Sequence, residues 1–131
     1  MKPIAAVLFD FYDTLFWRDR TTTTMALAAA AGITIDRERV EAITRAIDEE
    51  ARSPQELAKG RDLSAEAHRR CWTSLLRPLD ALTPRLDPPL SQRAYDDACS
   101  GTSHQLFPDT LRCIEKLAAM GIPIDMVNDI G

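Results

Sequence analysis

Two short apolar runs, one near each end of the chain, constrain the fold most. Residues 4–9 form a continuous run of strand length that stops at Asp10, and residues 122–127 form a second run of this kind. A continuous apolar run bounded by a polar residue is typical of a strand that is buried on both faces of a parallel sheet. We therefore expect these two segments to be strands of one sheet.

A helix is predicted immediately before the second run. Leu111, Ile114, Leu117 and Ala118 fall on one helical face, Asp109 or Thr110 is well placed as the N-cap, and Gly121 stands where a C-terminal cap belongs. A strand, a long excursion, a helix and a strand are the outline of an interrupted α/β unit.

The excursion, about residues 18–104, carries helix signals throughout. Ser53-Pro54-Gln55-Glu56 combines an N-cap serine, a proline at the first helical position and a glutamate at the third, which predicts a full capping box. The four prolines between residues 78 and 90 predict a stiff loop without regular structure. Further helices are predicted over 25–31 with Thr21–Thr24 as lead-in, from about Asp36, from Ser64, and over 90–99.

Composition excludes several classes of protein and partner. The 131 residues allow one domain, or a small core with an insertion. Sixteen Lys and Arg against twenty Asp and Glu give a net charge of −4, so nucleic acid is not an expected partner. The apolar runs are too short to cross a bilayer, so no membrane association is expected. Three widely spaced cysteines, Cys71, Cys99 and Cys113, predict buried or half-buried thiols of a cytoplasmic protein.

The segment Val7–Leu15 carries the chemistry. An acid directly after a buried strand lies at the carboxyl end of the sheet, where open α/β folds place their ligands. The Asp10 carboxylate there could act as a nucleophile and form a covalent ester or acyl phosphate, with Thr14 returning to fix its direction. The alternative is that Asp10 only ends the strand and caps the next turn.

Three segments, in chain order, resemble the haloacid dehalogenase-like (HAD) hydrolase superfamily. Val7–Leu15 resembles its first motif, Leu106–Leu111 resembles the segment that re-enters the core after a helical cap, and Val127–Gly131 resembles its second motif. The resemblance implies a Rossmann-like parallel-sheet core interrupted by an all-α cap. It implies a core strand and nucleophile loop over 1–16, a cap over 17–104, and a core helix and strand over 105–131.

The resemblance also assigns roles to single residues. Asp10 would be the nucleophile and Thr14 would order its loop. In metal-dependent members the Asp10 carboxylate and the Tyr12 carbonyl would bind Mg²⁺, a hard cation that prefers oxygen ligands. Asn128 would bind the transferred oxygens of a small-molecule substrate.

The sequence departs from the family pattern at three points. The phosphatases of the family usually carry Asp, as acid and base, where this chain has Tyr12, a poor base at neutral pH. The haloacid dehalogenases resemble this chain there, and they need no metal. Asn128 replaces the expected Ser or Thr. No residue can be assigned to the third and fourth motifs, which lie further along in the family, so we expect a truncated core.

Two functions are therefore expected. The first is a hydrolase that uses the aspartate nucleophile on a small organic phosphate, with Mg²⁺, or on a 2-haloacid, with no cofactor. The alternative is a catalytically silent truncated fragment that acts as a binding or self-assembly module. A two-stranded core leaves open sheet edges, which a homodimer or a complementing chain would cover.

Overall fold

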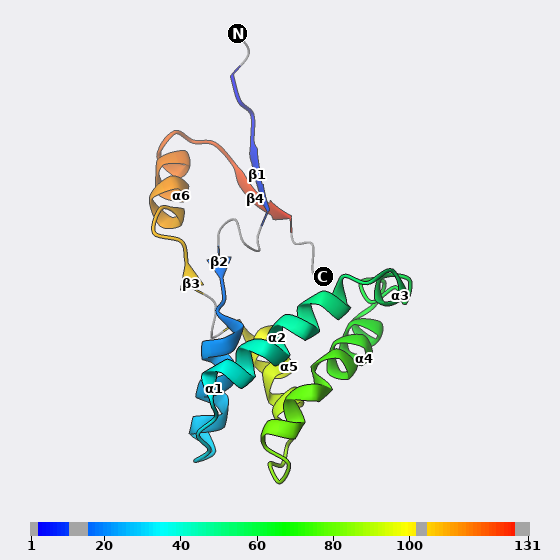
Figure 1. Cartoon of the computed structure of the whole chain (residues 1–131). Coiled ribbons are helices and arrows are strands. Elements are labelled where there is room, and N and C mark those ends of the chain that lie inside the picture. Colours follow the sequence, from blue (N-terminus) through cyan, green and yellow to red (C-terminus); the bar gives the residue numbers. More distant parts are fainter. Residues whose placement is uncertain (1–2, 11–15, 102–104, 128–131) are drawn as a thin grey trace. The chain divides into compact units, whose positions relative to one another are not determined.

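The computed structural model describes residues 3–10, 16–101 and 105–127. The chain divides into two units, a small one of residues 1–18 and 104–130 and a helical one of residues 19–103. Helix predominates and a small parallel sheet accompanies it, so the architecture is broadly α/β. Figure 1 shows the helices and strands of both units.

The small unit contains the parallel pair that the two apolar runs predict. Strand β1 (Val7–Asp10) runs parallel to β4 (Ile124–Val127), with Val7 opposite Ile124 and Asp10 opposite Val127. Helix α6 (Thr110–Ala119) precedes β4. A second pair, β2 (Phe16–Trp17) antiparallel to β3 (Gln105–Leu106), was not expected from the sequence.

Both strands of the parallel pair begin later than their apolar runs. The N–H of Ile122 donates to the Leu117 carbonyl at 3.1 Å, which makes residue 122 part of the C-terminal cap of α6. Gly121 takes a φ of 71° in that cap, as the sequence predicts. The Pro123 carbonyl accepts from the N–H of Val7 at 3.0 Å, and the ladder starts from there.

The expectation that the first strand is buried on both faces is wrong for the described residues. Leu8 is 67% exposed and Ile4 is 68% exposed. The sheet that contains β1 has two strands in the described part of the chain, too few to cover both of its faces.

The prediction of which residues form the apolar face of α6 is also partly wrong. Thr110 is buried and Ile114 and Leu117 are half-buried on one side of the helix, whereas Leu111 is 56% exposed and Ala118 is exposed. Cys113, which precedes Ile114 in the sequence, is exposed, and Cys99 on α5 is exposed as well. Of the three cysteines, only Cys71 is buried as predicted.

The helical unit is a four-helix bundle with two short additional helices. Its long helices pack in a closed ring, α1 on α2, α2 on α4, α4 on α5 and α5 on α1. The elements are α1 (Arg20–Ala30), α2 (Arg37–Ala51), α3 (Pro54–Leu57), α4 (Ala65–Leu76), the 3₁₀ helix η1 (Arg77–Leu82) and α5 (Leu90–Ser100).

Side-chain caps explain where most of these helices begin. Asp19, Asp36, Ser53 and Ser64 each accept a hydrogen bond from the backbone N–H three residues further on. Helix α5 begins after Pro89, and its cap comes from another element. The Asp80 carboxylate on η1 accepts from the N–H of Ser91 at 2.8 Å and from its hydroxyl at 2.9 Å.

Three local predictions need correction. Thr21–Thr24 lie inside α1 rather than before it, because Asp19 caps the helix earlier and Thr23 and Thr24 are buried. Residues 77–82 form η1 rather than a loop, since a proline in the first turn loses no intrahelical hydrogen bond. At Ser53 the serine half of the capping box is present, but its own N–H donates to the Glu50 carbonyl at 3.0 Å.

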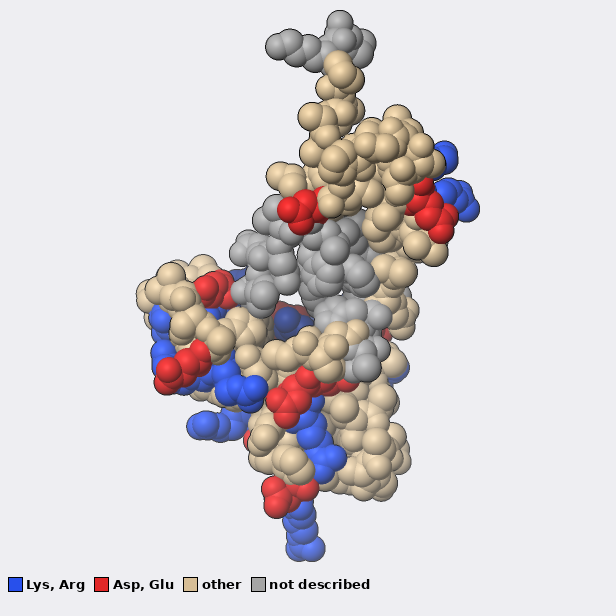
Figure 2. Space-filling view, turned by 180° about the vertical axis from the view of Figure 1, so that it is seen from behind, with Lys and Arg blue, Asp and Glu red and all other residues tan. Residues whose placement is uncertain are grey.

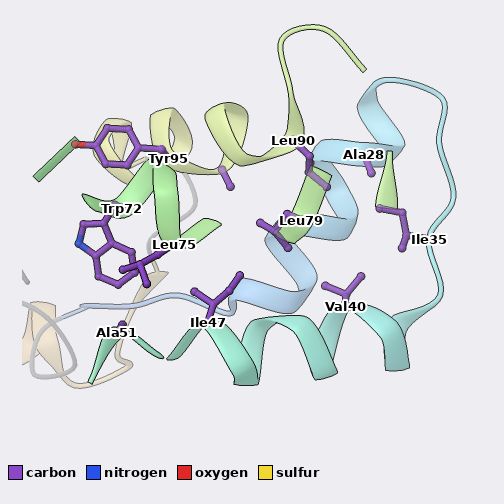
Figure 3. Packing of buried hydrophobic residues seen from close by; sticks show 11 residues of the cluster. Ala28, Ile35, Val40, Ile47, Ala51, Trp72, Leu75, Leu79, Leu90 and Tyr95 are labelled. Atoms are coloured by element: carbon purple, nitrogen blue, oxygen red, sulfur yellow. The ribbon is translucent and has the colours of Figure 1, made fainter. Parts of the chain in front are cut away.

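The core of the helical unit is one continuous cluster of aliphatic and aromatic side chains (Figure 3). Its largest fully buried side chains are Leu79, Leu90 and Val40, which come from η1, α5 and α2. Elements far apart in the sequence thus depend on the same contacts.

Replacing Leu90 by Ala is expected to lower the free energy of unfolding by about 2–5 kcal/mol, because the truncation leaves a cavity in this cluster. Denaturant unfolding of the full chain, followed by circular dichroism, measures the change. Leu63→Ala is the matched control: Leu63 is 87% exposed, and its truncation should change stability by less than about 0.5 kcal/mol. Equal effects of the two substitutions would contradict this description of the core.

Candidate functional site

The predicted nucleophile stands at the last position of β1. Its Cα partner across the ladder is Val127, the last residue of β4. Because the strands are parallel, both run out at the same edge of the sheet, the edge at which open α/β folds bind ligands. Residues 11 and 128 are the next residues in the sequence after the two strands.

The ladder describes the backbone of this edge and not its side chains. Tyr12, Thr14 and Asn128 lie outside the described residues, and so does the side chain of Asp10. The roles predicted for these residues therefore stay predictions. They are Asp10 as nucleophile, Thr14 as the residue that orders its loop, Asn128 as substrate ligand, and the Asp10 carboxylate and the Tyr12 carbonyl as magnesium ligands. Among the described residues, no group of three or more His, Cys, Asp or Glu side chains is placed to hold a metal ion.

The β2–β3 pair brings together the segment with which the chain leaves the small unit and the segment with which it re-enters that unit. Phe16 lies opposite Leu106 and Trp17 opposite Gln105. The chain therefore leaves through β2 and returns beside it through β3. Residues 19–103 are in this sense an insertion whose ends are held together.

Two arginines lie over the ring of Trp72 inside the helical unit. The guanidinium carbons of Arg20 and Arg61 lie 5.2 Å and 5.0 Å from the ring centroid. Arg20 also pairs with Asp48, and Nη1 of Arg61, a buried residue, donates to the Ala51 carbonyl at 2.7 Å. The cation–π contacts join α1 and the segment after α3 to α4, whereas the Asp48 and Ala51 contacts join the two arginines to α2. Sequence spacing does not reveal these contacts, because Arg20 is about fifty positions away from Trp72 and Arg61 lies outside the helices.

A second polar group lies between α4 and α5. The Nδ1 atom of His68 and the hydroxyl of Tyr95 share a hydrogen bond of 2.8 Å, and the Arg69 guanidinium carbon lies 4.9 Å from the Tyr95 ring centroid. Burial, with a side-chain hydrogen bond to Cys99, raises the pKa of Tyr95 to about 12. Desolvation disfavours the charged phenolate, so the neutral phenol is the form that fits this position.

Surface charge is mixed on the face of the molecule that Figure 2 shows. Basic and acidic side chains alternate over the helical unit there, and no broad patch of one sign covers that face. Within the described ranges, no helix combines the length and the apolar character that a membrane span requires.

Comparisons with known proteins found no match, whether with models of protein families, with curated proteins or with solved structures.

The pKa of Tyr95 can be measured by itself, because the chain has two tyrosines and the substitution Tyr12→Phe removes the other one. In Tyr12→Phe, phenolate absorbance should appear with a midpoint near pH 12 rather than near the ordinary value of about 10. The folded state prefers the neutral phenol. Its contribution to stability is therefore complete below about pH 10 and is lost as the pH rises through the folded pKa. A midpoint near 10 in protein that circular dichroism shows to be folded would contradict the assignment.

Proposed function

We propose that the chain is a hydrolase of the HAD-like type, with Asp10 as nucleophile, a Rossmann-like core and a helical cap over the inserted residues. The observation that carries the proposal is the register of the parallel ladder. Asp10 ends β1 directly opposite Val127 at the end of β4, so Asp10 and the start of the segment that resembles the second motif lie at the same end of the sheet. Two segments that are more than a hundred positions apart thus have neighbouring backbone positions.

The chemistry has two balanced steps. An oxygen of the Asp10 carboxylate attacks the phosphorus of a small organic phosphate, or the halogen-bearing carbon of a 2-haloacid. The bond to the alkoxide or halide leaving group breaks with its electron pair. Water then cleaves the acyl phosphate or ester, releases phosphate or the 2-hydroxy acid with a proton, and restores the carboxylate.

The two substrates place different demands on the neighbouring residues. An alkoxide leaves as an alcohol only when a proton is supplied, and the phenol of Tyr12 stands where the phosphatases carry Asp. A halide leaves without a proton. In the phosphatase form the Asp10 carboxylate and the Tyr12 carbonyl would hold Mg²⁺, which supplies positive charge for the phosphoryl oxygens. Asn128 would bind those oxygens through its amide N–H groups. A cytoplasmic location belongs to the same proposal.

Asp10→Asn is expected to lower phosphate or halide release by roughly 10³-fold or more, because the amide is a far weaker nucleophile. Release is measured with a panel of small phosphomonoesters, with and without Mg²⁺, and with 2-chloro- and 2-bromopropionate.

Asp13→Asn is the matched control, since it removes the same charge three residues away, and it should retain most of the activity. Equal activity of the parent chain and Asp10→Asn would exclude Asp10 as nucleophile. An inactive parent chain would contradict the hydrolase and favour the second function. Release of phosphate that stops when Mg²⁺ is chelated indicates the phosphatase form, and metal-independent halide release indicates the dehalogenase form.

A second function, a catalytically silent binding or self-assembly module, is favoured by the exposure of the first strand. Leu8 on β1 is 67% exposed, and Ile4, which precedes β1, is 68% exposed. Strands β1 and β4 each pair on one side within the described sheet. Open edges with exposed apolar side chains favour pairing with another chain.

Leu8→Lys is expected to shift a concentration-dependent dimer of this chain toward monomer, because a charge at an exposed strand position opposes edge pairing. Analytical ultracentrifugation over a range of concentrations measures the shift. Leu63→Lys, at an exposed position of the helical unit, should leave the association unchanged. A monomer at every concentration, or equal behaviour of both variants, would contradict self-assembly through β1.

A further inference from the structure

A pocket of about 330 Å³ lies between α2, α3, α4 and η1, entirely within the helical unit. Helix α2 contributes Ile43, Ile47 and Glu50, which recur at helical spacing on one face. Leu75 of α4 and Pro78 of η1 form an apolar wall opposite, and Ser74 of α4 is the one polar residue beside them in the lining. Figure 3 shows Ile47 and Leu75 projecting into the space between α2 and α4.

Glu56 of α3 also lines this pocket, and it is the unusual residue there. It is 6% exposed, although a glutamate is rarely buried without a full set of partners. One carboxylate oxygen, Oε1, accepts from Nζ of Lys59 at 2.5 Å. The other, Oε2, is buried and has no hydrogen-bond donor among the described residues. A buried acceptor without a donor is destabilising, so a donor at this position would be favourable.

The charge around the pocket specifies the donor. The carboxylates of Glu50 and Glu56 line the pocket, and the ammonium of Lys59, which pairs with Glu56, offsets one of them. One negative charge is left over beside an apolar wall. An anion would be repelled. A divalent metal ion would find two carboxylates and the Ser74 hydroxyl, which are too few oxygen ligands.

We propose that this pocket binds a primary alkylammonium ion. A rotation of the Glu56 carboxylate brings Oε2 to the pocket, where the ammonium donates to it close to the charge of Glu50, and the alkyl chain lies along Ile43, Ile47, Leu75 and Pro78. A charge-assisted hydrogen bond and apolar burial together fix both ends of such a ligand. The site is independent of Asp10 and of the proposed hydrolase.

The test titrates n-hexylammonium chloride into the full chain and follows backbone amide signals by NMR, with 1-hexanol and hexanoate as probes of the same length. Saturable shifts at α2, α3 and α4 are expected for the ammonium. Hexanol should bind at least about tenfold more weakly, because it lacks the charge, and hexanoate should not bind.

Two variants test the position. Glu56→Gln should weaken n-hexylammonium binding about tenfold or more, whereas Glu66→Gln, which removes an exposed charge from the first turn of α4, should not. Because Glu56→Gln also breaks the contact with Lys59, Ala46→Phe serves as a second variant. Residue 46 lines the pocket, and a phenyl ring there should fill it and abolish binding without changing Glu56.

The proposal is overturned by any of three results. These are no saturable binding, equal affinity for hexanol and n-hexylammonium, or binding that neither folded variant changes.

Discussion

The parallel pairing of β1 with β4 is the contact on which the organisation of the chain depends. It joins residues 7–10 to residues 124–127, so residues 19–103, which lie between them in the sequence, must leave the small unit, and the chain must return to it. The short β2–β3 pair brings the leaving and the returning segment together, with Phe16 opposite Leu106. The insertion between them is therefore free to be large, provided that its ends lie close to each other.

The inserted residues satisfy this condition because they form a bundle with a core of its own. Val40, Leu79 and Leu90 bring α2, η1 and α5 onto common contacts. Polar groups add directional contacts at the ends of the helices. Asp80 caps α5 from another element, and Arg20 and Arg61 hold α1 and the segment after α3 against Trp72. This core includes Tyr95, whose burial raises its pKa, and Glu56 is buried in the same unit.

Local structure was predictable from the sequence, whereas apart from the parallel pairing of β1 and β4 the contacts between distant residues were not. Ser53 and Ser64 cap their helices as expected because a cap depends on four consecutive residues. The apolar runs correctly predicted parallel strands, but not the exposure of Leu8, which depends on how many strands the sheet has. The threonine run was misplaced because Asp19 is a competing cap. β2 and β3 are too short to show any periodicity. For the candidate site, the position of Asp10 at the end of a strand followed from the sequence, whereas the burial of Glu56 depends on packing between helices.

The proposed hydrolase mechanism requires that the carboxylate at the end of β1 becomes covalently attached to substrate. The most direct measurement is mass spectrometry of the peptide that contains Asp10, after the chain is mixed with a substrate that it turns over and is quenched in acid before turnover is complete. We expect a mass increase on Asp10 that corresponds to an acyl phosphate or an ester, and its loss when the reaction runs to completion. Turnover with Asp10 unmodified at every time point, or with the adduct on another residue, would contradict it.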